Sequence, residues 1–449
     1  EDYKKFYREL YPANFEEPLF NIHLNVDYPF NLTGVLYFPK IKSNLDINRS
    51  KIQLYCNQVF VTDSVEGIVP EFLTLLHGVL DSPDIPLNVS RSYLQSDSNV
   101  KKISGHITKK VADKLADIFK ENREEFQKKW DDLKMFIEYG MISDEKFYER
   151  AEKFALFKNT DGEYFTFEEY KTKIEAAQKD MHNHLIYLYA TNAEDQYSYI
   201  KAAKNKEYDV LLLDGQLDMH FVNTLESKFG ESRFVRVDSD IVDNLIRKEN
   251  KIESVLSDNE QENVKWAFQG IVPEEKSYWV SADSMSSDDL PVIVTRDEFM
   301  RRMKEMSALS GGTGFYRELP DDYKVIINTN HPIIVDLSSK IEKKTNSKRL
   351  ELDSELTNLK AEKTEIDNKL KDIKNEDEKP AQDKARLEEL EDKIATLEEQ
   401  KQSIYKEFGK NQKIVSQLFD LALLSNNLLK GESLSNFVQR SVDLLGPKK

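Results

Sequence analysis

The stretch QVFVTDSVEGIVPEFLTLLHGVLDSPDIPLNVSRSYLQ, from Gln58 to Gln95, decides how the first part of this sequence is interpreted. It ends on a loop fixed by Pro86, and Ser90 is placed to cap a helix that begins at Arg91. Gln95 lies one helical turn further on and shares a face with Arg91. Backbone N–H groups at such a helix start point the same way as the guanidinium, so the stretch predicts a small anion-binding cradle. A solvated surface arginine remains the alternative.

Composition limits the class of protein. A chain of 449 residues with 39% hydrophobic residues is too long for one core, so two or three domains are expected. The net charge of −17 argues against a nucleic-acid partner. We expect no membrane partner, because no apolar run approaches the roughly 20 residues that span a bilayer and no signal peptide opens the sequence. A single cysteine, Cys56, excludes a disulfide framework and indicates a cytoplasmic protein.

The first 250 residues predict an α/β domain in two parts. The runs His23–Pro39 and Lys51–Val61 alternate apolar and polar residues, as half-buried antiparallel strands do. Ile103–Gly140 has helical spacing. The apolar runs His184–Ala190 and Tyr208–Asp214, separated by a helical segment, predict a parallel sheet covered on both faces. We therefore expect a larger α/β unit over 1–125, a helical connector over 126–180 and a smaller α/β unit over 181–250.

The second half, 251–449, predicts an α+β domain. Strands are expected within Ser277–Ser284, Leu290–Arg296 and Tyr323–Pro332. The tail Asn411–Gly446 contains two apolar helices around Gly431, which pair either with a second copy of the chain or with the chain's own domain.

An insertion over 340–410 carries two heptad seams, in which seam residues recur at alternating steps of four and three. Folded back at Pro380, the seams predict an antiparallel coiled-coil hairpin. Its layers would place Ile373 opposite Leu387 and Lys363 opposite Leu397. The hairpin is either a solvated protrusion or a docking arm for a partner.

The helix predicted over Thr295–Gly312 places Phe299, Met303 and Met306 on one side. Methionine suits a surface that accepts many partners, but an ordinary buried stripe has the same spacing.

Two sequence patterns that resemble ligand-binding motifs do not meet the requirements of those motifs. The run Gly311–Gly314 lacks the Gly-Lys-Ser/Thr of a phosphate-binding loop. His182 and His184 have no third ligand placed by the sequence, so no metal site is predicted.

The amino-acid sequence of Gln58–Gln95 and the order of the predicted elements resemble the middle and C-terminal domains of the heat-shock protein 90 chaperones, especially the bacterial high-temperature protein G. The resemblance covers nearly the whole chain except about Lys340 to Lys410. It implies an ATP-dependent chaperone whose ATP and Mg²⁺ are held by a separate N-terminal domain. That domain is absent from this sequence, so we expect the chain alone to bind no nucleotide.

Roles for individual residues follow from the resemblance. Arg91 and Gln95 match residues that meet the γ-phosphate of ATP, and Asn88 shapes their loop. Phe60 matches an apolar contact toward the N-terminal domain, although a core aromatic at a strand end would look the same. The residues Phe299, Met303 and Met306 match a helix that binds unfolded client proteins. Homodimerisation is implied for a group of apolar tail residues: Leu418, Leu421, Leu424, Leu428, Phe437 and Val438. A non-catalytic scaffold or adaptor, recruiting a partner through the coiled coil, is the alternative function.

Overall fold

The computed structural model describes residues 2–12, 14–28, 30–40, 51–63, 65, 69–84, 98–248, 252–273, 277–296, 298–309, 322–371 and 380–445. Its contacts divide the chain into two compact units. The first comprises residues 1–193 and 204–236, and the second comprises 194–203 and 237–449. The chain is therefore a mixed α/β protein of more than one domain, as the sequence predicted.

The first unit opens with α1 (Asp2–Leu10) and a five-stranded sheet in the order β1-β2-β5-β3-β4. The strands are β1 (Phe20–Val26), β2 (Leu32–Phe38), β3 (Lys51–Cys56), β4 (Val59–Thr62) and β5 (His77–Asp81). The antiparallel β1–β2 pair confirms the strands expected over His23–Pro39. The run Lys51–Val61 differs from a single strand, because Asn57 and Gln58 adopt positive φ angles and turn it into the β3–β4 hairpin.

Gly78 in β5 is required by close packing between strands. Its φ is +146°, and a Cβ there would lie 2.1 Å from the carbonyl oxygen of Val35. Any larger residue would push β2 and β5 apart.

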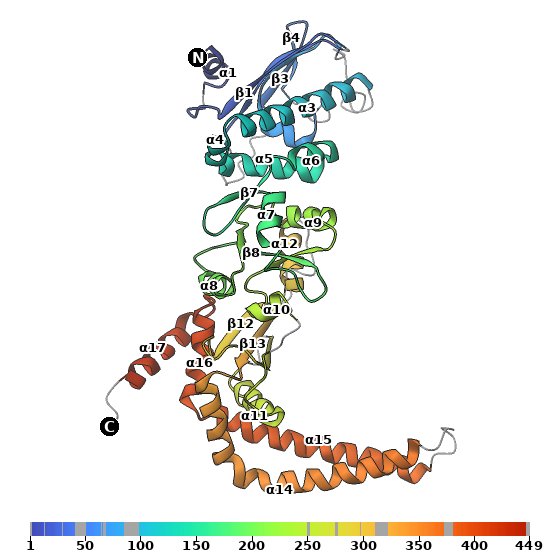
Figure 1. Cartoon of the computed structure of the whole chain (residues 1–449), viewed down its shortest axis with the longest axis vertical. Coiled ribbons are helices and arrows are strands. Elements are labelled where there is room, and N and C mark those ends of the chain that lie inside the picture. Colours follow the sequence, from blue (N-terminus) through green and yellow to red (C-terminus); the bar gives the residue numbers. More distant parts are fainter. Residues whose placement is uncertain are drawn as a thin grey trace. The chain divides into compact units, whose positions relative to one another are not determined.

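Helices cover this sheet, as Figure 1 shows for α3 and α5. They are the 3₁₀ helix η1 (Glu71–Leu75) and the α-helices α3 (Ser98–Glu121), α4 (Arg123–Lys128), α5 (Trp130–Ser143) and α6 (Glu145–Ala151). On α3, Ile103, Ile107, Val111 and Leu115 recur every fourth residue and are all buried. That stripe is the apolar face that an amphipathic helix presents to a core.

A second, smaller sheet is parallel and has the order β10-β8-β9. The elements of this part of the first unit are β6 (Leu156–Lys158), β7 (Tyr164–Thr166), α7 (Phe167–Ile174), β8 (Leu185–Ala190), β9 (Val210–Leu212), α9 (Asp218–Lys228) and β10 (Ser232–Arg236). The helix α8 (Tyr197–Asn205) follows β8 in the sequence and belongs largely to the second unit. Every residue of β8 is buried. The continuous apolar run therefore forms the central strand of a parallel sheet, as predicted.

The second unit is built around a three-stranded sheet in the order β11-β13-β12. Its strands are β11 (Tyr278–Asp283), β12 (Val292–Arg296) and β13 (Tyr323–Asn328). Its helices are α10 (Val242–Leu245), α11 (Asp258–Gln269), α12 (Glu298–Leu309), α14 (Pro332–Lys371), α15 (Ala381–Lys410), α16 (Lys413–Leu424) and α17 (Gly431–Leu445). Buried residues of the sheet, α11, α14, α15 and α16 form one core.

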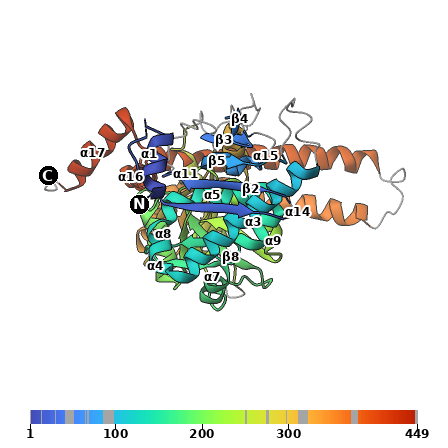
Figure 2. The same ribbon diagram turned by 90° about the horizontal axis from the view of Figure 1, so that it is seen from above.

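The two long helices α14 and α15 lie side by side, as Figures 1 and 2 show. Ile366, Leu370 and Leu390 form a buried cluster between them. Their relative register differs from the predicted one: the Lys363 ammonium pairs with Glu391 at 2.8 Å, and Lys401 pairs with Asp353 at 2.7 Å. Lys363 therefore lies beside Leu390 and not opposite Leu397, which is a shift of one heptad. Pro380 is the residue that immediately precedes α15.

Candidate functional site

The predicted cradle residues Asn88, Arg91 and Gln95 lie outside the described residues. The entry to their loop is described. The Asp84 carboxylate accepts a hydrogen bond from the backbone N–H of Asn31 at 2.7 Å, and the Ser82 hydroxyl donates to the Asn31 carbonyl at 2.6 Å. The chain is therefore fixed to the β1–β2 connection where it leaves β5.

The β3–β4 turn is fixed at the same end of the sheet. The Asp81 carboxylate at the end of β5 accepts a hydrogen bond from the Gln58 backbone N–H at 2.9 Å. Because β3 runs parallel to β5 with Tyr55 opposite Asp81, the β3–β4 turn and the end of β5 lie at the same edge of the sheet.

Phe60 is exposed beside this turn. It lies on the edge strand β4 with 54% of its surface exposed, and its ring touches only the edge of Tyr55 among the described rings, with centroids 5.7 Å apart. The neighbouring Val59 is 59% exposed, and sequence reasoning did not select it. Two exposed apolar residues on an edge strand beside the predicted loop make this end of the sheet our candidate docking site, which we call the β4 edge.

The predicted client-binding helix is α12, and one of its three selected side chains is described. Met303 is partly buried, whereas the side chains of Phe299 and Met306 lie outside the described set. Both arginines of the helix bind one acid: Arg301 and Arg302 each contact Glu298 at 2.7 Å. Glu298 thereby holds two cations against its own helix.

The six predicted dimerisation residues fall into two groups. Leu418 is buried in the core of its own unit, and Leu428 and Phe437 are partly buried against that core. Leu421, Leu424 and Val438 are exposed by 43%, 37% and 51%. Val442, which the sequence analysis missed, is 58% exposed and lies one helical turn from Val438.

Polar contacts fix α17 against α16. The Arg440 guanidinium donates to the Asp420 carboxylate, and the Gln417 side-chain amide donates to the Ser441 hydroxyl at 2.7 Å. Burial raises the pKa of Asp420, although Arg440 acts in the opposite direction.

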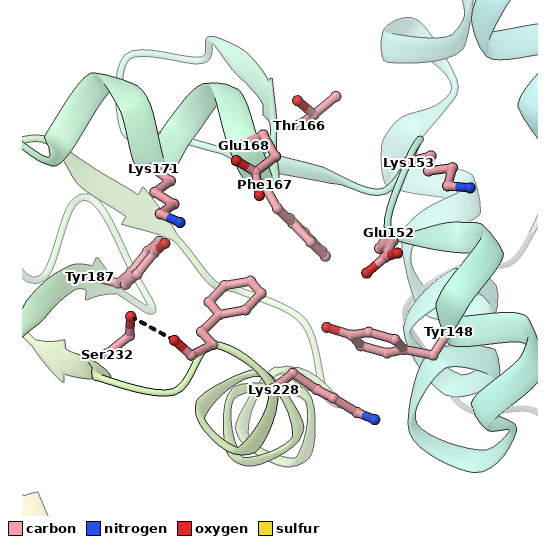
Figure 3. Close-up of a pocket in the computed structure, with 11 residues that line it drawn as sticks. Tyr148, Glu152, Lys153, Thr166, Phe167, Glu168, Lys171, Tyr187, Lys228 and Ser232 are labelled. Atoms are coloured by element: carbon pink, nitrogen blue, oxygen red, sulfur yellow. Dashed lines mark hydrogen bonds between the residues drawn. The ribbon is translucent and has the colours of Figure 1, made fainter.

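The first unit contains a hollow between α6, α7, β8 and the end of α9 (Figure 3). The sequence analysis did not predict it. Its volume is about 610 Å³, and Tyr148, Phe167, Tyr187 and Phe229 contribute aromatic rings to its wall. Each ring belongs to a different element and has the spacing of an ordinary core residue. Their convergence depends on tertiary structure, so periodicity could not reveal it.

No three His, Cys, Asp or Glu side chains in the described ranges gather as metal ligands would. None of the described helices combines the length and apolar character needed to cross a bilayer.

Comparison with known proteins places the chain in a family. A profile described as Hsp90 protein matches residues 1–356. Chaperone protein htpG of Bacteroides fragilis (strain YCH46) is 55% identical over 447 residues, covering 99% of this chain and 65% of that protein. Chaperone protein HtpG of Porphyromonas gingivalis is 53% identical over 447 residues with the same coverage. A mitochondrial TNF receptor-associated protein 1 homolog from Dictyostelium discoideum is 26% identical over 372 residues, which is 80% of this chain and 50% of that protein.

The chain thus spans 65% of the length of the bacterial relatives that it matches along nearly all of its own length. With a family profile over residues 1–356 and chaperones of 53% and 55% identity, the chain belongs to the Hsp90 protein family.

Proposed function

We propose that this chain is the client-holding and ATPase-completing part of an ATP-dependent molecular chaperone of the cytoplasm. Family membership carries the proposal, because the relatives of 53% and 55% identity are named chaperone proteins. Residues 1–250 would form the middle domain and 251–449 the C-terminal dimerisation domain, with residues 340–410 as a coiled-coil insertion.

In this proposal ATP and Mg²⁺ are bound by a domain outside this chain, and that domain docks on the β4 edge. Phe60 would supply an apolar contact, and Asn88 would shape the loop. Arg91 would meet the γ-phosphate, with Gln95 donating a neutral hydrogen bond. The exposure of Phe60 supports this arrangement, as does the position of the β3–β4 turn at the end of β5, from which the chain continues toward Asn88 and Arg91.

Clients and a second protomer would bind the second unit. Phe299, Met303 and Met306 of α12 would contact unfolded clients, and the exposed apolar residues of α16 and α17 would face a second copy. The partly buried Met303 and the exposed Leu421, Leu424 and Val438 are compatible with these roles.

ATP turnover by the full-length protein tests the central proposal. Arg91→Ala should lower turnover by about 10³-fold, if Arg91 stabilises transition-state charge as arginines do in other phosphoryl-transfer enzymes. Arg233→Ala, at an exposed arginine of β10, is the matched control and should leave turnover unchanged. Turnover that survives Arg91→Ala would remove Arg91 from the ATPase site.

The scaffold hypothesis is the second candidate, and the long paired helices α14 and α15 favour it. A scaffold would lose its partner when residues 345–405 are replaced by a short turn, and Arg91→Ala would have no effect on partner binding. The chaperone proposal predicts that ATP turnover falls more in Arg91→Ala than in the variant that lacks residues 345–405.

A further inference from the structure

We propose that the hollow beside α7 is a second polypeptide-binding site, which receives an aromatic residue of an extended, unfolded chain (Figure 3). The inference deepens the proposed chaperone function and rests on it. All residues that line the site belong to the first unit, whereas α12 belongs to the second.

The hydroxyls of Tyr148 and Tyr187 border the hollow. Tyr148 and Tyr187 are only 4% and 1% exposed, and within the described part of the chain neither hydroxyl has a hydrogen-bond partner. Figure 3 shows the Tyr148 hydroxyl pointing into the hollow. A hydroxyl that is open to the hollow and makes no hydrogen bond within the described residues can donate to and accept from a polar ligand there.

Both tyrosines remain neutral at physiological pH. Burial raises the pKa of Tyr148 to about 12, and burial also raises the pKa of Tyr187. A neutral hydroxyl both donates and accepts, which matches the carbonyl and N–H groups of a peptide backbone.

The remaining wall is aromatic. The Phe167 and Phe229 rings lie edge to face with centroids 5.6 Å apart, and Tyr187 lies 5.6 Å from Phe229. The Lys228 ammonium sits 5.0 Å from the centre of the Tyr148 ring and pairs with Glu145. Lys228 is therefore already neutralised, and the wall favours an aromatic side chain.

The rim carries balanced charge. Glu152 and Glu168 line it together with Lys153 and Lys171. A rim of two carboxylates and two ammonium groups gives no net attraction to a polyanion such as a nucleotide. It suits a chain that carries residues of both signs.

A neighbouring hollow favours an extended ligand over a small molecule. It has a volume of about 590 Å³, shares Glu168 with the first, and is lined by Tyr164 and Phe165. Arg123 also lines it but is paired with Glu169 at 2.6 Å. A polypeptide that places one aromatic residue in the first hollow would continue past Glu168 into a second apolar surface.

Calorimetric titration of this chain with a defined peptide tests the inference. The probe is an acetylated and amidated nine-residue peptide with one tryptophan between a lysine and a glutamate. We expect one peptide per chain, and at least tenfold weaker binding when alanine replaces the tryptophan. N-acetyl-L-tryptophanamide should bind at least tenfold more weakly than the peptide, because it reaches one hollow only. Equal affinity for the two would overturn the extended-chain assignment.

Variants locate the binding site. Tyr148→Phe and Tyr187→Phe keep the rings in place and should each weaken the peptide about three- to tenfold, the usual effect of one hydrogen bond. Tyr28→Phe, at a tyrosine that is 88% exposed and outside the hollow, is the matched control. Binding that is insensitive to both hollow variants would overturn the inference.

Aggregation suppression by the wild-type full-length protein separates this inference from the proposed function. If aggregation suppression persists while Tyr148→Phe and Tyr187→Phe leave the peptide affinity unchanged, only the second binding site is ruled out. Absent suppression of a heat-denatured client defeats the chaperone proposal, and the peptide titration still reports on the hollow.

Discussion

At the scale of single residues, Glu138 of α5 is an acid buried against another acid. Glu138 and Asp218 are 3% and 2% exposed. Asp218 Oδ2 accepts from the Lys134 ammonium at 2.9 Å and from the Gly215 N–H at 2.8 Å. Its Oδ1 is buried and receives no donor from the described residues. A protonated Glu138 would supply that missing donor.

Burial, followed by the neighbouring Asp218, raises the pKa of Glu138 well above its usual value. Lys134 acts in the opposite direction, and Asp214 adds to the rise. The folded state therefore holds a proton that the unfolded chain releases near pH 4.3 (about the ordinary glutamate pKa). The stabilisation is complete below that pH and is lost as the pH rises through the folded-state pKa.

Glu138→Gln should remove this pH dependence, because the amide cannot ionise and still donates a hydrogen bond to Asp218. At pH 8 the variant should melt about 2–4 °C above the wild type, which is the shift expected for about 1 kcal/mol. Near pH 5 the two proteins should melt together. Thermal melts followed by circular dichroism across this range provide the measurement. Glu145→Gln on α6, whose carboxylate is exposed and pairs with Lys228, is a control that should keep the wild-type slope. Parallel melting curves for wild type and Glu138→Gln at every pH would contradict the protonated state.

At the scale of elements, the heptad seams identify both long helices but leave their register open. A heptad pattern is unchanged by a shift of seven residues, so the seam alone fits either alignment. Ion pairs beside the seam distinguish them: Lys363 pairs with Glu391 and Arg386 with Glu362, each at 2.8 Å. The sequence analysis placed the turn at Pro380, whereas Pro380 immediately precedes the first residue of α15. The error came from treating proline as the turn when it begins the second helix.

Engineered disulfides test this register. Cysteines at positions 363 and 390 should cross-link on mild oxidation, because the Lys363 ammonium pairs with Glu391, the neighbour of Leu390 in the sequence. Cysteines at positions 363 and 397, which face each other in the register predicted from the sequence, should remain reduced. The native Cys56 is buried and should not compete. Cross-linking would be read as a mobility shift on a non-reducing gel, and a reversed result would restore the register expected from Pro380.

Elements were predicted more successfully than the sites between them. Alternation in β1 and the apolar run of β8 follow from the local sequence, so their strands were found. The β4 edge required the positive φ angles of Asn57 and Gln58, which periodicity does not indicate. The hollow beside α7 required four elements to converge, and each of its rings resembles a core residue. Local pattern specifies which face is buried and does not specify which buried faces leave a space.

At the scale of the whole molecule, the structure changes how dimerisation should be tested. Deleting the tail from Asn411 would also remove Val415 and Phe419, which belong to the second unit's own core. Loss of the dimer in such a variant would follow from unfolding alone. The exposed side of α16 and α17, which includes Leu424, Val438 and Val442, contains residues whose replacement leaves that core intact.

Leu424→Asp combined with Val438→Asp should therefore convert a homodimer to a monomer while the melting temperature of the chain stays close to that of its wild-type monomer. Leu424 and Val438 are 37% and 51% exposed in one protomer, so an aspartate there can be solvated until a second copy buries it. Burying an unpaired carboxylate disfavours association. Sedimentation velocity at micromolar concentration measures the change in mass. Leu418→Asp provides the contrast, because that side chain is 5% exposed and should lower stability by about 3 kcal/mol or more in either oligomeric state. A dimer that persists in the double variant would show that these faces of α16 and α17 are not the interface.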